Sequence, residues 1–166
     1  LPAAVKAVVG RPVVGTGPMD APAVAGRTLA EGKADIIGMA KTLIADPHFP
    51  NKAREGRLAD IRQCIACTQS CVGHVDLGLG VGCIYNPVTG REKEWADLPS
   101  AERAKKVVIV GAGPAGMEAA RIAAQRGHDV VLIDRNKRMG GQIGLVMKAP
   151  DRGSFEEYQA ALTSGD

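Results

Sequence analysis

The chain has 166 residues, of which 45% are hydrophobic and only 3% are aromatic, and its formal net charge is +3. A length of this order holds about one domain or parts of two, and the core has to be built from Ala, Val, Ile and Leu. No stretch combines clustered Lys and Arg with aromatic residues, so we expect no nucleic-acid partner. No apolar run approaches the ~20 residues of a membrane span, so we expect a soluble, cytoplasmic protein without a membrane contact.

The two ends of the sequence resemble interrupted helices. The chain opens with "LPAAVKAVVG", which has no initiator Met and is typical of the end of a helix. It closes with "GSFEEYQAALTSGD", which begins a helix and then stops. We therefore expect an internal fragment of a larger protein.

The first segment, residues 1–56, alternates short apolar runs with helical patterns. "RPVVGTG" predicts a strand, and the following helix starts near Pro22 and stops at Gly32. "ADIIGMAKTLIADP" predicts a strand at Ile36 and Ile37 and a short helix ended by Asp46 and Pro47. Alternating strands and helices of this kind form parallel sheets, so the sequence indicates an α/β fold.

The second segment, residues 57–104, contains all four cysteines and little periodic structure. Their spacing is C-x2-C-x3-C-x11-C, and the glycines of "GHVDLGLGVG" suit a tightly folded loop. Such a loop is too polar to fold on apolar burial alone and is expected to need a metal. The charged stretch that follows, from Arg91 to Lys106, predicts a solvated connector between domains.

The cysteine spacing leaves three kinds of site open. Two C-x2-C pairs would be typical of structural zinc, whereas three close cysteines and one distant cysteine favour an iron–sulfur cluster over zinc. Two disulfides are a third alternative, although they are uncommon beside a nucleotide-binding fold of cytosolic type. Arg62 could place positive charge near the site or be an ordinary surface residue.

The third segment, residues 105–166, carries a dinucleotide-binding pattern. A buried strand is expected at Val107 to Val110, a helix from Ala115 to Arg126 that Gly127 closes, and a second buried strand at Val130 to Ile133. The turn between the first strand and the helix reads "GAGPAG", and an acidic residue ends the second strand. This context is the one that a G-x-G-x-x-G motif requires, so the sequence predicts the start of a Rossmann-type domain.

Each residue of this turn has an expected role in nucleotide binding. Gly111 permits the tight turn, Gly113 lets the backbone approach a pyrophosphate, and Gly116 lets helix and strand pack closely. The start of the helix at Ala115, just after Pro114, directs free N–H groups at the phosphates. The residues expected at the nucleotide are Gly111, Gly113, Pro114, Ala115, Gly116, Asp134, which would accept hydrogen bonds from a ribose, and Gly141 in a further glycine turn. The motif leaves FAD, NAD(P) and ADP open.

The ordered combination of "DIRQCIACTQSC", "GCIYNP" and "GAGPAG" resembles the iron–sulfur branch of the NADH:flavin oxidoreductases, which includes trimethylamine dehydrogenase, histamine dehydrogenase and 2,4-dienoyl-CoA reductase. The resemblance spans nearly the whole chain. It implies that Cys64, Cys67, Cys71 and Cys83 hold a 4Fe-4S cluster. It also implies that residues 1–56 are the last units of a (β/α)8 barrel that binds FMN.

In barrels of this type the loops after the seventh and eighth strands commonly bind phosphate. The resemblance therefore implies that the FMN phosphate is held by Gly15, Thr16, Gly17, Met39, Ala40 and Lys41. Related sequences often have Arg in place of Lys41, and a Lys supplies the charge without the planar fork.

Two enzyme functions share this machinery, and the catalytic residues lie outside the chain in both. In an amine dehydrogenase or demethylase, FMN oxidises a C–N bond of a small-molecule substrate and the cluster passes electrons to an acceptor such as an electron-transfer protein. In a 2,4-dienoyl-CoA or enoate reductase, NAD(P)H supplies the electrons through FAD. On the resemblance we favour amine oxidation. A third alternative is a non-enzymatic, metal-stabilised module for nucleotide binding or electron transfer. A homo-oligomer is left open.

Overall fold

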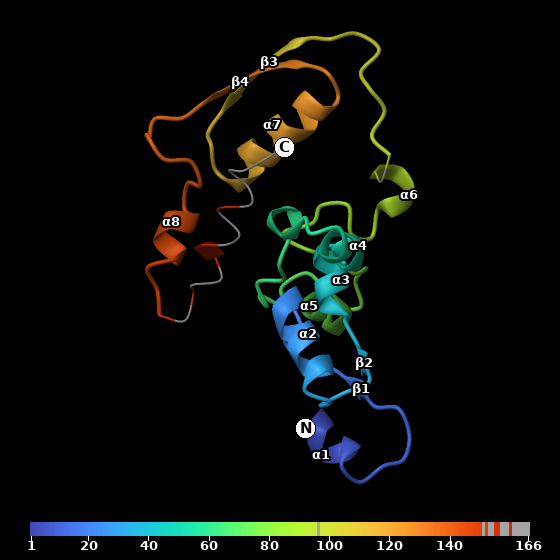
Figure 1. Ribbon diagram of the computed structural model, residues 1–166. Coiled ribbons are helices and arrows are strands. Elements are labelled where there is room, and N and C mark those ends of the chain that lie inside the picture. Colours follow the sequence, from blue (N-terminus) through green and yellow to red (C-terminus); the bar gives the residue numbers. More distant parts are fainter. Residues whose placement is uncertain (96, 151, 153–154, 157–159, 161–166) are drawn as a thin grey trace. The chain divides into compact units, whose positions relative to one another are not determined.

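The computed structural model describes residues 1–95, 97–150, 152, 155–156 and 160 (Figure 1). The chain divides into two compact units, Leu1–Gly90 and Arg91–Asp166. The expected division at residues 56 and 104 is finer than this one and stays a prediction. The helix expected near the end of the sequence falls largely outside the described residues. No helix among the described residues is both long and apolar enough to cross a membrane.

The first unit begins with α1 (Pro2–Lys6) and then contains two parallel strands, β1 (Val14–Gly15) and β2 (Ile36–Ile37), joined through α2 (Pro22–Ala30). Val14 pairs with Ile36 in the ladder. Pro22 stands in the first turn of α2, where its missing N–H costs nothing, and Gly32 adopts a φ of 64° just after the helix. The expected strand, helix, strand order is confirmed.

Four short helical elements follow in this unit: α3 (Lys41–Ala45), α4 (Phe49–Arg54), the 3-10 turn η1 (Leu58–Asp60) and α5 (Val72–Asp76). α3 ends where expected, because Pro47 disfavours helical geometry at the preceding Asp46, which has φ −144° and ψ 97°. Phe49 is 2% exposed and belongs to a core with Ile61, Ile65 and Tyr85. Of these four elements only α3 was expected; the sequence did not reveal α4, η1 or α5.

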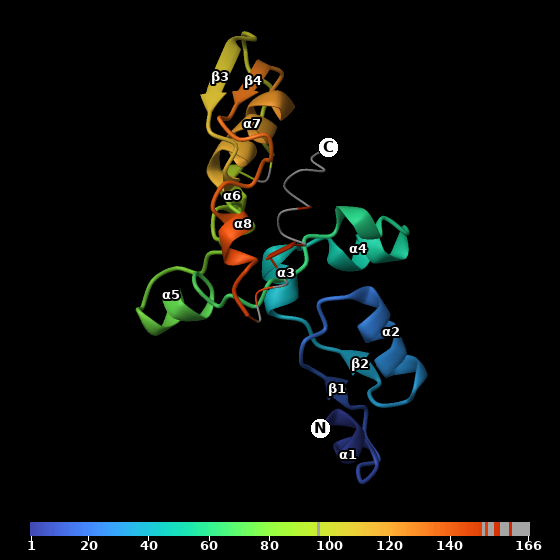
Figure 2. The same cartoon turned by 90° about the vertical axis from the view of Figure 1, so that its left-hand side faces the viewer.

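The second unit contains α6 (Glu92–Trp95), β3 (Lys106–Val110), α7 (Pro114–Gln125), β4 (Asp129–Ile133) and α8 (Ile143–Val146). β3 and β4 are parallel over five residues each, and α7 lies beside both strands in the two views (Figures 1 and 2). α7 begins and ends one residue earlier than expected, and Gly127, with a φ of 85°, follows it as expected. The connector before β3 is tied to the end of α7, since the Ala101 N–H donates to the Arg126 carbonyl at 2.8 Å.

The expectation that both strands are buried was wrong for one face of the pair. Val110 is 83% exposed, Val108 is 55% exposed and Ile133 is 49% exposed. The alternate residues are partly buried, and Ile109 lies at the close approach of α7 to the sheet. A strand is buried on both faces only when both are covered, and α7 covers one.

Candidate functional site

The first pocket lies at the carboxyl ends of β1 and β2. Backbone pairing continues past the strands, because the Gly38 N–H donates to the Gly15 carbonyl at 2.8 Å. A Cβ on Gly15 would stand 2.8 Å from the Cβ of Ala34, which precedes β2, so there is no room for a side chain at Gly15. The pocket residues are Thr16, Gly17, Pro18, Asp20, Gly38, Met39, Ala40, Lys41, Thr42, Cys64 and Ala66.

Five of the six residues expected at the FMN phosphate, all but Gly15, line this pocket. Gly15 is buried behind them as part of β1. Lys41 is the first residue of α3 and is exposed, so its ammonium can reach an anion in the pocket. Asp20 is a lining residue that the sequence did not single out. The role of the six expected residues as phosphate ligands stays a prediction.

All four cysteines line a second pocket of the same unit, together with Lys41, Ile44, Ala45, Ile65, Thr68, Ser70, Ile84 and Tyr85. Each cysteine is a free, partly buried thiol, and none forms a disulfide. The described residues contain no group of three or more His, Cys, Asp or Glu side chains that could hold one metal ion. The thiols instead surround a shared space with a largely apolar wall.

The backbone around Cys67 has an unusual conformation. Ala66 has a φ of 51° and Thr68 has a φ of 56°, in the left-handed region that non-glycine residues seldom adopt. Such residues cost free energy and occur mainly where a binding site demands them. The turn thus points to a binding role for the "CIACTQ" loop.

Backbone hydrogen bonds bring the distant fourth cysteine to the other three. The Gly82 N–H donates to the Ser70 carbonyl at 2.8 Å, which joins the residues just before Cys83 and Cys71. Cys71 caps α5, and the Gly73 N–H donates to the Thr68 carbonyl at 2.9 Å. The Tyr85 N–H lies 3.4 Å from the Cys83 Sγ and donates to it.

The pKa of the Cys64 thiol is raised by its surroundings. Burial raises the pKa of the Cys64 thiol, and negative charge on Cys83 and Cys67 raises it further. The Ala66 N–H and the Lys41 ammonium act in the opposite direction without reversing the shift. A thiol in this position loses its proton most readily when a metal takes its place.

The thiol pocket rests on the end of α3 through polar contacts that the sequence did not reveal. Asp46 is 3% exposed and accepts a hydrogen bond from the Arg62 N–H at 3.0 Å. Asn86 donates to the Ile44 carbonyl at 3.1 Å, and so does Thr89 at 2.9 Å. These partners are 16 to 45 residues apart in the sequence, so local patterns gave no signal for them.

In the second unit, a hydrogen bond joins the glycine turn to Asp134. The Asp134 carboxylate accepts hydrogen bonds from the Ala112 N–H at 2.7 Å and the Asn136 N–H at 2.6 Å. These bonds, that of Asn136 first, hold the pKa of Asp134 below its usual range. A Cβ on Gly116 would stand 1.8 Å from the Gly111 carbonyl oxygen, so only glycine permits this approach of α7 to the turn.

The other residues expected at the nucleotide lie in the same part of the unit. Gly113 precedes α7, Pro114 and Ala115 begin it, and a Cβ on Gly113 would have no neighbour within 4 Å. Gly141, with a φ of 55°, approaches the Gly113 backbone closely. Gly141 also lines a pocket with the cationic residues Arg135, Lys137, Arg138 and Lys148. The turn therefore has open space for a ligand where the motif expects a pyrophosphate.

Two family models match the chain. Residues 3–60 match the NADH:flavin oxidoreductase / NADH oxidase family, and residues 106–165 match the FAD dependent oxidoreductase family. Both models describe flavin-linked oxidoreductases. The match of residues 3–60 confirms the resemblance to the NADH:flavin oxidoreductases that the motifs indicated.

Individual relatives include both dehydrogenases and reductases. The chain is 44% identical over 155 residues to N,N-dimethylglycine/sarcosine dehydrogenase of Chromohalobacter salexigens, covering 92% of this chain and 22% of that protein. It is 44% identical over 161 residues to cinnamate reductase of Clostridium sporogenes, covering 95% of this chain and 24% of that protein. The structure of histamine dehydrogenase from Rhizobium sp. 4-9 matches with a TM-score of 0.89 and 34% identity over 96% of this chain and 24% of that one. The chain thus spans about a quarter of the length of these relatives.

Proposed function

We propose that the full-length protein carrying this sequence is an amine dehydrogenase or demethylase that contains FMN and a 4Fe-4S cluster and passes electrons from FMN to the cluster. One observation carries the proposal: Lys41 and Cys64 line both the pocket after β1 and β2 and the pocket of the four thiols. A flavin phosphate and a cluster placed in these pockets would be neighbours. The similarity to N,N-dimethylglycine/sarcosine dehydrogenase and histamine dehydrogenase supports amines as the substrate class.

The fold proposed for the first unit is the end of a (β/α)8 barrel. β1 and β2 are parallel and each is followed by a helix, as successive barrel strands are. Their carboxyl ends open into the pocket of Thr16, Gly17 and Lys41, which is the position of phosphate sites in such barrels. Exposed backbone N–H groups and the Lys41 ammonium would hold the phosphate there.

The four thiols fit a cluster by the chemistry of their donor set. In a 4Fe-4S cluster each iron takes one cysteine thiolate, so the thiols surround the cluster rather than converge on one atom. Free thiols from Cys64, Cys67, Cys71 and Cys83 line one pocket, and the Tyr85 N–H donates to one of them. When bound, a flavin supplies two-electron chemistry and a cluster supplies one-electron transfer at a potential set by burial and hydrogen bonds to sulfur.

The second unit is proposed to be the start of a Rossmann-type domain that binds FAD or ADP. The parallel order β3, α7, β4 and the glycine turn at the start of α7 support this assignment. Asp134 would accept a hydrogen bond from a ribose hydroxyl through the carboxylate lone pairs that its two bonds to backbone N–H groups leave free. The match of residues 106–165 to FAD dependent oxidoreductases favours FAD.

A second candidate is an NAD(P)H-dependent enoate reductase, which the similarity to cinnamate reductase favours. The same pockets serve both functions, with the electrons moving in opposite directions. The electron partner then differs: an acceptor such as an electron-transfer protein for the dehydrogenase, and NAD(P)H for the reductase.

Anaerobic reduction of the full-length protein separates the two candidates. For the dehydrogenase, N,N-dimethylglycine or dimethylamine bleaches the flavin absorbance, and the paramagnetic signal of a reduced cluster follows. For the reductase, NADPH bleaches the flavin, and cinnamate restores its absorbance. A flavin that responds to an amine without any change at the cluster would contradict the proposed transfer of electrons between them.

A further inference from the structure

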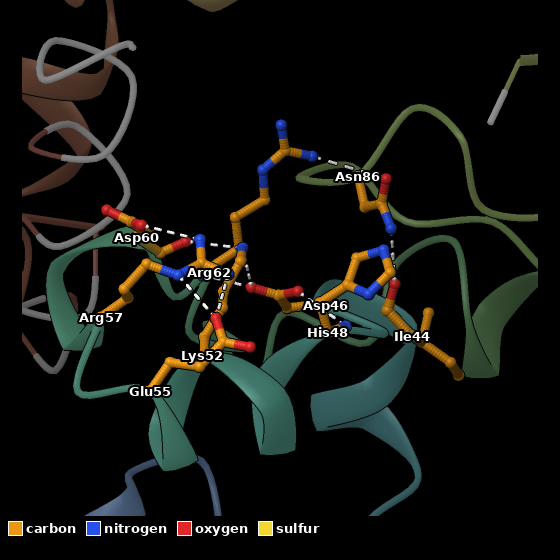
Figure 3. Close-up of polar contacts among 9 residues, drawn as sticks. All are labelled: Ile44, Asp46, His48, Lys52, Glu55, Arg57, Asp60, Arg62 and Asn86. Atoms are coloured by element: carbon orange, nitrogen blue, oxygen red, sulfur yellow. Dashed lines mark hydrogen bonds and ion pairs between the residues drawn. The ribbon is translucent and has the colours of Figure 1, made fainter. Parts of the chain in front are cut away.

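The end of α3 carries a buried carboxylate that is held on several sides (Figure 3). Asp46 Oδ2 accepts hydrogen bonds from the Lys52 ammonium at 2.7 Å and from the backbone N–H of Arg62 at 3.0 Å. Its Oδ1 accepts one from the backbone N–H of His48 at 3.0 Å. The Lys52 side chain is 17% exposed, so the ion pair is largely shielded from water. Removing one partner of such a pair leaves an uncompensated charge and unsatisfied donors.

A second group of contacts holds the opposite end of the cysteine segment on the same helix. The carbonyl of Ile44, the next-to-last residue of α3, accepts hydrogen bonds from Asn86 Nδ2 at 3.1 Å and from Thr89 Oγ1 at 2.9 Å. Asn86 is 6% exposed, and its Oδ1 accepts from the Val88 N–H at 3.2 Å. The longer contact from Arg62 Nη1 to Asn86 Oδ1, at 3.4 Å, links the two groups.

These contacts flank the thiol pocket closely. Arg62 stands two residues before Cys64, and Asn86 stands three residues after Cys83. Ile44 also lines the pocket itself. The first and fourth cysteines, which are the pair most distant in sequence, are thus tied to one five-residue helix.

We propose that Asp46 and Asn86 are positioning residues that hold Cys64 and Cys83 at the spacing an iron–sulfur cluster requires. The inference rests on the proposed function, because it takes the four thiols as cluster ligands. Neither side chain lies in the ligand set, so their effect passes through the backbone at Arg62 and through Ile44. Removing a group that orients a metal ligand without binding the metal itself typically lowers metal affinity or activity by about 10- to 100-fold.

The test compares Asp46→Ala and Asn86→Ala with the control Glu55→Gln in the full-length protein, purified without oxygen. Glu55 is a suitable control because its carboxylate is nearby in sequence and its side chain is 47% exposed, where it pairs with Arg57. The measurements are the rate of iron release to a chelator, the paramagnetic resonance spectrum of the reduced cluster and the flavin content. Thr89→Val, which removes one hydroxyl donor at nearly constant volume, provides a mild variant if Asp46→Ala does not fold.

We expect iron release to be about tenfold faster or more in Asp46→Ala and Asn86→Ala, with an altered spectrum and normal flavin content, and a smaller change in the same direction in Thr89→Val. The control should match the wild type. If the wild type contains the cluster but Asn86→Ala and Thr89→Val release iron at the wild-type rate and give the wild-type spectrum, the positioning role alone is overturned. Equal loss of flavin and iron would assign these residues to general folding and would also overturn it. A wild-type protein with zinc and no sulfide would overturn the proposed function as well.

Discussion

Lys41 and Cys64 both line the two pockets of the first unit, and the positive charge of Lys41 lowers the pKa of the Cys64 thiol against the stronger effect of burial. Lys41 begins α3 directly after the loop that follows β2. Cys64 begins the cysteine loop. One cation is therefore placed to act on an anionic group in either pocket.

Replacing this cation should affect both sites. We expect Lys41→Met to weaken FMN binding about tenfold through loss of a charge-assisted phosphate contact, and Lys41→Arg to retain binding. The reduction potential of the cluster should fall in Lys41→Met, because the reduced cluster carries more negative charge. Flavin retention during dialysis and a redox titration measure the two effects. Lys33→Met, which removes an exposed lysine paired with Glu31, is the control, and equal flavin loss in both variants would refute the assignment.

The loop that carries Cys83 closes through a contact that only glycine permits. A Cβ on Gly90 would stand 2.4 Å from the Val81 carbonyl oxygen, and Gly90 has a φ of 78°. We expect Gly90→Ala to lower the iron content of the purified protein by displacing the segment before Cys83. Gly80→Ala is the matched control, since a Cβ on Gly80 has no neighbour within 4 Å. Iron analysis that finds the two variants alike would contradict this role.

Two glycines of the dinucleotide turn should differ when each is changed to alanine. Gly116→Ala forces a Cβ against the Gly111 carbonyl oxygen and should destabilise the second unit by about 3 kcal/mol, as overpacking does. Gly113→Ala meets nothing in the folded chain, so it should leave the melting temperature nearly unchanged and reduce nucleotide binding only. Thermal unfolding and bound FAD or ADP content are the measurements. Normal nucleotide content in Gly113→Ala would mean that no phosphate approaches this backbone.

Asp134 should make stability depend on acid pH. Its pKa is lowered in the folded chain by the N–H groups of Asn136 and Ala112, so its stabilising effect is complete above the ordinary carboxyl pKa of about 3.9 and is lost as pH falls through the lowered value. We expect the melting temperature of wild type to exceed that of Asp134→Asn at pH 6 and the difference to shrink steadily below about pH 4. A difference that grows as the pH falls would have the wrong sign.

Local signals in the sequence were sufficient to predict the strand pairs of both units and the helices that follow their first strands. Pro22, Gly32, Pro47 and Gly127 set helix boundaries by their own backbone restrictions, and the structure has the helices there. The strand pairs of both units followed from the same alternation. The exposure of Val108 and Val110 was not predictable in this way, because it depends on what covers each face of the sheet.

The support of the candidate site was not predictable either. In the sequence, Asp46 was noted only as a helix-ending residue before a proline, and Asn86 only as part of the motif "GCIYNP". Their hydrogen bonds to Arg62 and Ile44 join segments that no periodicity relates. The grouping of the cysteines was implied by family resemblance and spacing, whereas the hydrogen bonds of Asp46 and Asn86 at the end of α3 could be found only in the folded chain.

The most direct test of the proposed function is the iron, zinc and acid-labile sulfide content of the full-length protein, purified without oxygen, together with the variants Cys64→Ser and Cys83→Ser. We expect about four irons and four sulfides per chain in the wild type, and loss of the cluster in both variants. About one zinc per chain without sulfide would show that the cysteines form a structural clip, and electron transfer between the two pockets would then be contradicted.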